Sequence, residues 1–552
     1  MPGLPSASSS SSACRDFGDA RGAGLLVGIL FVVLASAAAH LLFSWMGFNP
    51  SDDGFVLAYS RRLLGGQMPH RDFISIRPVG SALLHAPAVL LGGDSVFWLS
   101  RLLVWLEFSC VAWVWTGIAA GRMKLRFGAW ERVLLAVIAL ALSAHSFPAM
   151  AWHTTDAVFL SSAGLALCVR ASRRAELAGY ALVGLACLCK QNFLVMAPAA
   201  LLALGGWRRL GPWLAAAAPG VVYLAWLAAA GALPDAWAQM TAQAGLLQAG
   251  VIPYLVVFSF PWGILLGYLA AAGALRQSVA AQRVGSATLC AVPLAFILLL
   301  AAGMHVRVPA FGLYGVAAGA TACLLRERAA GARTGLLLLA LGWAASLSLG
   351  YNSPALVAGP LALLLIGIAS RAPAGILSAR LPRRRALLAA LGVVVAAAWF
   401  HLRQEHVYLD RPARQLTEPL GGLFPGTRHL WTNPNTRAAL ADLQAAIALA
   451  GGKPFAIIPD FPAYWVKAPQ RNPLPIDWAQ GTELASPALL QRVLDTLDGQ
   501  RGRPVVIVQK FDARFLPLGL VPLEEPGRYR VVQHVRARFA RFAETRFFDL
   551  YQ

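Results

Sequence analysis

Long apolar segments alternate with short polar ones through the first 400 residues of this chain. A membrane-spanning helix needs about 20 mostly apolar residues, because only a helix satisfies its own backbone hydrogen bonds across the hydrocarbon core. The segments that fit this pattern are 24–45, 95–119, 130–147, 154–171, 176–190, 193–206, 212–231, 254–274, 285–303, 308–325, 334–350, 354–370 and 385–402. The pattern therefore predicts a polytopic α-helical membrane protein with about thirteen spans.

Basic residues are distributed unevenly among the loops between these segments. The loops rich in Arg or Lys are GRMKLRFGAWER, RASRRAE, GWRRLGP, ALRQSVAAQR, RERAAGAR and SRAPAGILSARLPRRR, and the loops that alternate with them are FPAMAWHT, GALPDAWAQM, GMHVRVP and SLGYNSP. The positive-inside rule then gives one consistent orientation, with a cytoplasmic N-terminus, an odd number of spans and residues 403–552 outside. Segments 176–190 and 193–206 could instead form one broken helix, but losing that turn would contradict the charges of all later loops.

Polar regions flank the apolar part of the chain. The Ser-rich residues 1–23 are expected to form a disordered cytoplasmic tail before an uncleaved first span. In the C-terminal region, residues 436–450 and the segment ASPALLQRVLDTLDG have a helical pattern, whereas KPFAIIP and RPVVIVQK resemble buried strands. A crossover is the simplest connection between these two strands. Residues 403–552 are therefore predicted to form a small extracytoplasmic α/β domain that follows the transmembrane domain, residues 24–402.

Composition supports the membrane assignment, since 58% of the residues are hydrophobic and only 13% are charged. The net charge of +21 invites a nucleic-acid function, yet the basic residues occupy the loops of one membrane side, so no nucleic-acid partner is expected. The seven cysteines suggest neither a disulfide framework nor a metal motif. No glycosylation sequon is present, which favours a bacterial inner membrane with the C-terminal domain in the periplasm.

The longest outer loop, residues 46–94, contains the first candidate chemistry. Two adjacent carboxylates, Asp52 and Asp53, follow the first span and precede an amphipathic helix that would lie on the membrane surface. Residues 79–92 are apolar but too short to span. The sequence SDDG is also a helix-capping signal, so Asp52 could simply cap the helix, or one aspartate could cap it while the other performs chemistry.

This loop resembles a known family. An acidic pair followed by Gly, a helix, Gly-Gln-x-Pro-x-Arg-Asp-Phe and an Arg-Pro-x-Gly turn is similar to the first outer loop of GT-C glycosyltransferases, which include protein O-mannosyltransferases and the lipid A aminoarabinose transferase. The resemblance implies a GT-C-like fold and an inverting glycosyltransferase. The donor would be a polyprenyl-phosphate-linked sugar, and the acceptor would be a hydroxyl on a lipid, glycan or protein. Membrane lipids would be further partners. Many relatives carry Glu where Asp53 stands, so the resemblance leaves open which aspartate is the base.

Further candidates follow from the resemblance. Asp156, in the second outer turn, is a candidate second acid, although it could instead cap the fourth span. Lys190, at the outer end of the fifth span, would hold the lipid phosphate, although it could instead reach to the membrane interface. The basic residues on the outer face that could bind the departing phosphate, or else lipid headgroups, are His70, Arg71, Arg77, His305 and Arg307.

Other features are open to more than one interpretation. A divalent cation bridging Asp52 and Asp156 would suit two carboxylates, although no ligand spacing requires one. Glu107, inside the second span, is expected to be paired in the bundle or to face a cavity, without a catalytic role. The loops 457–465 and 471–478 suit docking onto the membrane part better than sugar binding. The rival functions are a transporter or lipid flippase and a non-catalytic subunit, but the candidate charges gather at one membrane face and no internal repeat is evident.

Overall fold

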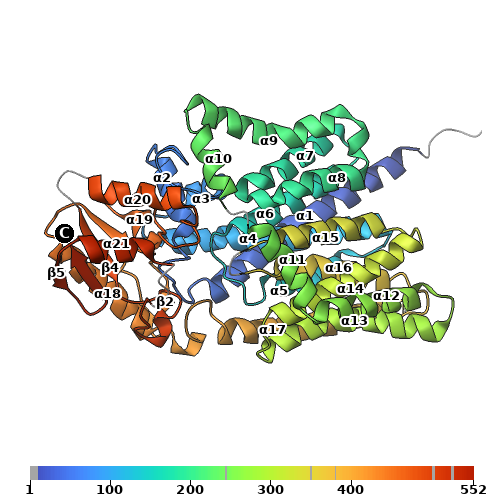
Figure 1. Cartoon of the computed structure of the whole chain (residues 1–552). Helices are drawn as coiled ribbons and strands as arrows, with labels where there is room; N and C mark the ends of the chain where they lie inside the picture. The colour runs from blue at the N-terminus through green and yellow to red at the C-terminus, as the bar shows by residue number, and fades with distance from the viewer. Residues whose placement is uncertain (1–9, 243–244, 349–350, 379–380, 500–503, 524–527) are drawn as a thin grey trace, which may run out of the picture.

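The computed structural model describes residues 10–242, 245–348, 351–378, 381–499, 504–523 and 528–552. Each predicted span coincides with a helix of a large bundle (Figure 1). These helices are α1 (Ser10–Phe43), α4 (Val96–Met123), α5 (Ala129–Ala144), α6 (His153–Cys168), α7 (Arg173–Cys189), α8 (Met196–Leu204), α9 (Leu210–Ala229), α12 (Ser259–Leu275), α13 (Val279–Ala301), α14 (Arg307–Arg326), α15 (Ala332–Ser346), α16 (Ala358–Ala369) and α17 (Leu381–Glu405). Within the described residues, 6 helices are long and apolar enough to cross a membrane, or up to 7 if a bent pair forms one span. The polytopic helical architecture is confirmed, whereas the count of thirteen spans stays a prediction.

Shorter helices connect and extend the bundle. They are α2 (Phe55–Leu64), α3 (Gly80–Leu91), α10 (Leu233–Thr241), α11 (Leu246–Val256), α18 (Pro434–Leu449), α19 (Pro462–Lys467), α20 (Pro487–Gly499) and α21 (Arg530–Arg538). The 3₁₀ turns are η1 (Gly93–Ser95), η2 (Gln191–Val195), η3 (Gly206–Arg208), η4 (Pro354–Val357), η5 (Ala413–Gln415) and η6 (Leu516–Leu518). Helices α10 and α11 were not predicted, because they are short and α11 contains a proline.

Two details of the helical part bear on the predictions. Lys190 is extended between α7 and η2, and Gly206, just beyond α8, touches Tyr180 in the first half of α7. Helix α8 therefore runs back along α7, as expected for two segments and not for one broken helix. At the N-terminus, α1 begins at Ser10, so part of the predicted disordered tail continues the first span as a helix, and residues 1–9 lie outside the described residues. Extending an existing helix is far easier than starting one.

The C-terminal unit, residues 406–552, contains a four-stranded sheet in the order β3-β4-β6-β5. The strands are β3 (Phe455–Ile458), β4 (Val505–Gln509), β5 (Arg541–Glu544) and β6 (Phe548–Tyr551), and a separate pair is formed by β1 (Glu418–Pro419) and β2 (Trp431–Thr432). Strands β3 and β4 pair in parallel on either side of α20, which confirms the predicted crossover. Both strands are buried throughout, which explains why each is a continuous apolar run. Strand β5 is mostly exposed and lacks that signal.

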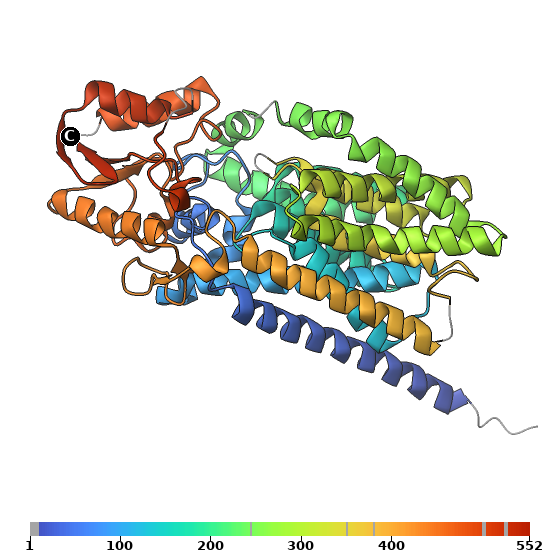
Figure 2. The same cartoon turned by 90° about the horizontal axis from the view of Figure 1, so that it is seen from below.

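The C-terminal unit sits at one end of the helical bundle, and the start of α1 lies at the other end (Figures 1 and 2). The first outer loop is docked on this unit. Arg62 of α2 forms a two-point ion pair with buried Asp477, with N–O distances of 2.6 and 2.8 Å. The backbone N–H of Ile74 donates to the carbonyl of Pro475 at 2.7 Å. Segment 471–478 therefore serves docking, as the sequence favoured, and the loop and the unit form one surface at that end of the bundle.

Candidate active site

The turn before α2 is built by local hydrogen bonds. The side-chain oxygen of Asn49 accepts the backbone N–H groups of Ser51 and Asp52, both at 3.0 Å. Gly54 then passes so close to the backbone of Ala463 that a Cβ atom would lie 2.0 Å from the backbone nitrogen of Ala463. The sequence Asn-Pro-Ser-Asp-Asp-Gly thus forms a compact turn that is pressed against the C-terminal unit, with its two aspartates in fixed and different directions.

Asp53 is a structural residue in this turn. One carboxylate oxygen accepts the backbone N–H of Asn49 at 2.9 Å, and the other pairs with Arg101 of α4 at 2.8 Å. The same guanidinium donates to the carbonyls of Ser44, Met46 and Gly47. Asp53 and Arg101 are both buried, so the pair fastens the start of the outer loop to the bundle.

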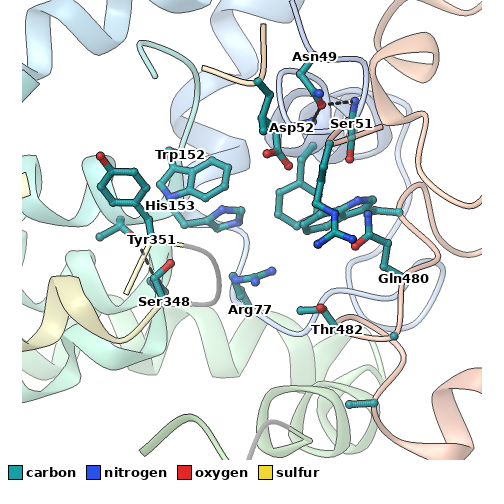
Figure 3. Close-up of a pocket in the computed structure, with 18 of the residues that line it drawn as sticks. Asn49, Ser51, Asp52, Arg77, Trp152, His153, Ser348, Tyr351, Gln480 and Thr482 are labelled. Carbon is teal, nitrogen blue, oxygen red and sulfur yellow. Dashed lines mark hydrogen bonds between the residues drawn. The ribbon is translucent and has the colours of Figure 1, made fainter. Parts of the chain in front are cut away.

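Asp52 points instead into a cavity of about 820 Å³ between the outer loop, the bundle and the C-terminal unit (Figure 3). Among the described residues that line this cavity, Asp52 is the single carboxylate. The lining side chains that can carry a positive charge are Arg77, Lys190, Arg514 and Arg528. The lining aromatic and imidazole side chains are Phe55, Trp152, His153, Tyr351, Tyr408 and Trp478. The cavity therefore combines one acid with several cations and aromatic faces.

The carboxyl group of Asp52 is held in a state suited to proton transfer. Burial raises its pKa to about 6, although the hydroxyl of Tyr408, which donates to it at 2.7 Å, acts in the opposite direction. A carboxylate with this pKa is ionised at neutral pH and is more basic than an exposed aspartate. Helix α2 has Gly54 at its N-cap and no side-chain capping bond, so neither aspartate caps it.

Two of the predicted phosphate ligands reach the cavity, each held by a neighbour. Arg77 forms an ion pair with buried Glu483 at 2.8 Å, and its guanidinium lies 5.4 Å from the ring centre of Phe55. The ammonium group of Lys190 is buried and donates to the hydroxyl of Thr154 at 3.0 Å. Lys190 therefore faces the protein interior and not the membrane interface.

Four other predicted phosphate ligands do not line the cavity. Arg71 is half-exposed and pairs with Asp72 at 2.9 Å. His305 is exposed, and Arg307 donates to the side chain of Asn352 at 2.8 Å. Their predicted membrane side helped to suggest them, but none of these side chains lines the space beside Asp52. His70 is also elsewhere, buried against Tyr223 and Gln239.

The second acidic candidate also lies outside the cavity lining. Asp156 is fully buried, and one of its oxygens lies 3.2 Å from Nε2 of His85. Helix α6 begins after Trp152 without a side-chain capping bond, so Asp156 does not act as a cap either. The two acids of the predicted cation bridge thus occupy different sites, because Asp156 turns toward His85 and Asp52 toward Tyr408.

Several cavity residues were not found by sequence reasoning. Arg514 and Arg528 come from the C-terminal unit, where Arg528 donates to the side chain of Gln480 at 2.6 Å. Tyr408, just beyond α17, supplies the hydroxyl on Asp52. Trp478 of the docking loop also lines the cavity. The sequence could have suggested the arginines of the C-terminal domain as candidates, because this domain was predicted to lie on the same side of the membrane as Asp52 and Asp53.

Comparison with known proteins gives one consistent likeness. No protein-family model matches the chain, and no curated protein matches its sequence. The chain is similar to the crystal structure of ArnT from Cupriavidus metallidurans bound to undecaprenyl phosphate, with 14% identity, coverage of 95% of this chain and 97% of that chain, and a TM-score of 0.44. The apo structure of the same ArnT gives the same identity and coverage, with a TM-score of 0.42.

Proposed function

We propose that the protein is an inverting glycosyltransferase that moves a sugar from a polyprenyl-phosphate donor to an acceptor hydroxyl at the outer face of the membrane. One observation carries the proposal: a single buried carboxylate, Asp52, shares its cavity with Arg77, Lys190, Arg514 and Arg528. Such a transfer needs a base at the acceptor and cations at the leaving phosphate, and both are present in one space. The resemblance of the first outer loop to that of GT-C glycosyltransferases supports the same reaction.

Asp52 is the proposed general base. It would remove the proton from the acceptor hydroxyl as the oxygen attacks the anomeric carbon of the donor sugar. A single displacement places the incoming oxygen on the face opposite the leaving phosphate, so the anomeric configuration is inverted. With a pKa of about 6, the carboxylate is ionised at neutral pH and basic enough to share the proton in the transition state.

Lys190 and Arg77 are the proposed ligands of the leaving phosphate. As the bond between sugar and phosphate breaks, negative charge grows on the departing polyprenyl phosphate. Fixed cations in a partly enclosed cavity stabilise that charge more strongly than water-exposed ones, and they need no rearrangement during the reaction. Glu483 and Thr154 hold the two side chains in place before the donor arrives.

The location of the cavity suits a lipid-borne donor. The cavity lies where the bundle meets the C-terminal unit, so an isoprenoid tail would remain among the helices while the sugar enters the polar space. Trp152, Tyr351 and Trp478 provide apolar ring faces on which a sugar could stack. We propose that this end of the bundle faces the periplasm of a bacterial inner membrane, in agreement with the loop charges.

Label transfer from purified donors tests the proposal. The full-length protein in lipid nanodiscs is incubated with radiolabelled polyprenyl-phosphate sugars and with lipid, glycan and protein acceptors. We expect label to move to one acceptor class, with inverted anomeric configuration, and we expect no transfer by Asp52→Asn. Glu405→Gln, which changes an acid outside the cavity lining that pairs with Arg414, is the matched control and should keep full activity. Full transfer by Asp52→Asn would refute the assignment of the base.

A transporter or lipid flippase is the rival function. Proteoliposomes with labelled donor on one side distinguish the two, because a flippase moves intact donor across the bilayer. Movement of intact donor, together with no label on any acceptor class, would favour the rival.

A further inference from the structure

A second polar cluster lies within the helical part, outside the lining of the cavity described above. It consists of His85 on α3, Glu107 on α4 and Asp156 on α6. One nitrogen or oxygen atom from each side chain lies within 4.8 Å of the other two. All three side chains are almost completely buried, with exposed fractions of 0%, 1% and 0%. Residues from three separate helices thus converge at one point in an apolar environment.

The carboxylates of this cluster lack sufficient hydrogen-bond donors. Among the described residues, neither oxygen of Glu107 has a hydrogen-bond partner, and Oδ2 of Asp156 has none. The other Asp156 oxygen lies 3.2 Å from Nε2 of His85. Buried charged groups in membrane helices are strongly unfavourable unless they are paired or bind an ion. Within the described residues His85 pairs with Asp156, whereas Glu107 has no such partner.

We propose that His85, Glu107 and Asp156 bind one divalent cation. Two ionised carboxylates and a neutral imidazole carry a charge of −2, which a divalent ion cancels. An ion at the centre would contact one atom of each of the three side chains. One imidazole and two carboxylates suit Zn²⁺ or Mn²⁺.

The surroundings of His85 fit a metal ligand. Its second ring nitrogen, Nδ1, lies 3.3 Å from the hydroxyl of Ser100 on α4. Ligating histidines commonly use their second nitrogen in this way, and the bond fixes the orientation of the ring. When Nδ1 carries the proton and donates to Ser100, Nε2 is unprotonated toward Asp156 and can bind the ion.

The ion would fasten α3 to the bundle. Helix α3 has only 12 residues, contains Pro87 and belongs to the first outer loop. Asp156 follows Thr154 by two positions on α6, and Thr154 holds Lys190 in the cavity. A cation bound by Asp156 would therefore hold the part of α6 that carries Thr154, and none of its three ligands lines the cavity. Metal content and thermal stability can both be measured without the transfer reaction.

Metal content is the first test. The full-length protein is purified with an affinity tag that lacks histidine, dialysed against Zn²⁺ or Mn²⁺, washed, and analysed by inductively coupled plasma mass spectrometry. We expect about one ion per chain in the wild type and at least a tenfold loss in Glu107→Gln and Asp156→Asn. The control Glu405→Gln should keep its ion. A wild type with only background metal after both dialyses, or variants that bind as much as the wild type, would overturn the proposal.

A second measurement uses the wild type alone, so it stands even if the variants do not fold. The melting temperature is followed after treatment with a chelator and again after Zn²⁺ or Mn²⁺ is restored. We expect a loss of roughly 5 °C or more that the ion reverses, because an ion bound to the folded state stabilises it. An unchanged melting temperature after complete removal of the metal would contradict the proposed link between the helices.

Discussion

Replacing Tyr408 with Phe removes a hydroxyl that donates to the Asp52 carboxylate at 2.7 Å, and leaves the ring in place. This bond favours the ionised carboxylate and so opposes the effect of burial, which raises the pKa of Asp52 to about 6. Without the bond, the pKa of Asp52 should rise further. If Asp52 is the base, the pH at which activity is lost on acidification must rise with it.

The size of the shift follows from the strength of the bond. A hydrogen bond to a charged acceptor contributes about 1.5–3 kcal/mol, and one pKa unit corresponds to about 1.36 kcal/mol. The expected shift is therefore about 1–2 units, with the lower value if water enters and replaces the hydroxyl. The Asp52 carboxylate is ionised above its pKa and protonated, hence inactive as a base, below it. Because the pKa of Asp52 is higher in Tyr408→Phe, the variant should lose roughly threefold or more of its activity near pH 6.5 and little near pH 9.

The assay is the pH dependence of kcat/KM for label transfer, measured from pH 5 to 9 in wild type and variant. The donor is a phosphodiester and stays anionic over this range, so it adds no titration of its own. Tyr268→Phe is the control for the loss of a tyrosine hydroxyl. The hydroxyl of Tyr268 accepts a hydrogen bond from Arg326 on α14, outside the cavity lining, so this variant should match the wild type. An acidic limb that stays at the same pH in Tyr408→Phe would refute the assignment of Asp52 as the titrating base.

Three further predictions follow from the same contacts. Asp53→Asn leaves buried Arg101 without its carboxylate partner and should destabilise the protein by about 3–5 kcal/mol, seen as a lower melting temperature, whereas a melting curve equal to that of Asp52→Asn would contradict the separation of roles. Gly54→Ala places a Cβ atom 2.0 Å from the backbone of Ala463, so it should destabilise the folded protein by about 1–3 kcal/mol. The C-terminal unit should then become sensitive to limited proteolysis, and a digestion pattern like that of the wild type would argue against the close contact. Lys190→Met should lower kcat/KM for transfer by about tenfold to a hundredfold with the fold retained, and an unchanged value would remove Lys190 from the phosphate site.

Local patterns in the sequence were sufficient for most of the architecture. Apolar runs located the helices of the bundle, and the buried strands 455–458 and 505–509 were readable because each is apolar on both faces. Helix α10 and strand β5 were missed because neither has a long apolar run: α10 is short and begins at a Leu-Pro pair, and β5 is mostly exposed.

The candidate site was only partly predictable, because it depends on contacts between distant segments. The pair Asp52 and Asp53 was visible in the sequence, but their different roles arise from Tyr408, 356 positions from Asp52, and from Arg101, 48 positions from Asp53. Arg514 and Arg528 reach the cavity only through the packing of the C-terminal unit. Arg71 and Arg307 shared the predicted membrane side with the site, but a shared side does not bring two side chains together.

Single-turnover transfer, measured together with donor binding, tests the central role of Asp52 most directly. Wild type and Asp52→Asn are compared with the polyprenyl-phosphate sugar that the label-transfer screen identifies. The proposed chemistry predicts similar donor affinity in both proteins and a transfer rate at least about a thousandfold lower in the variant, since the amide cannot accept the proton. A variant that transfers sugar within tenfold of the wild-type rate, with the same affinity, would contradict it.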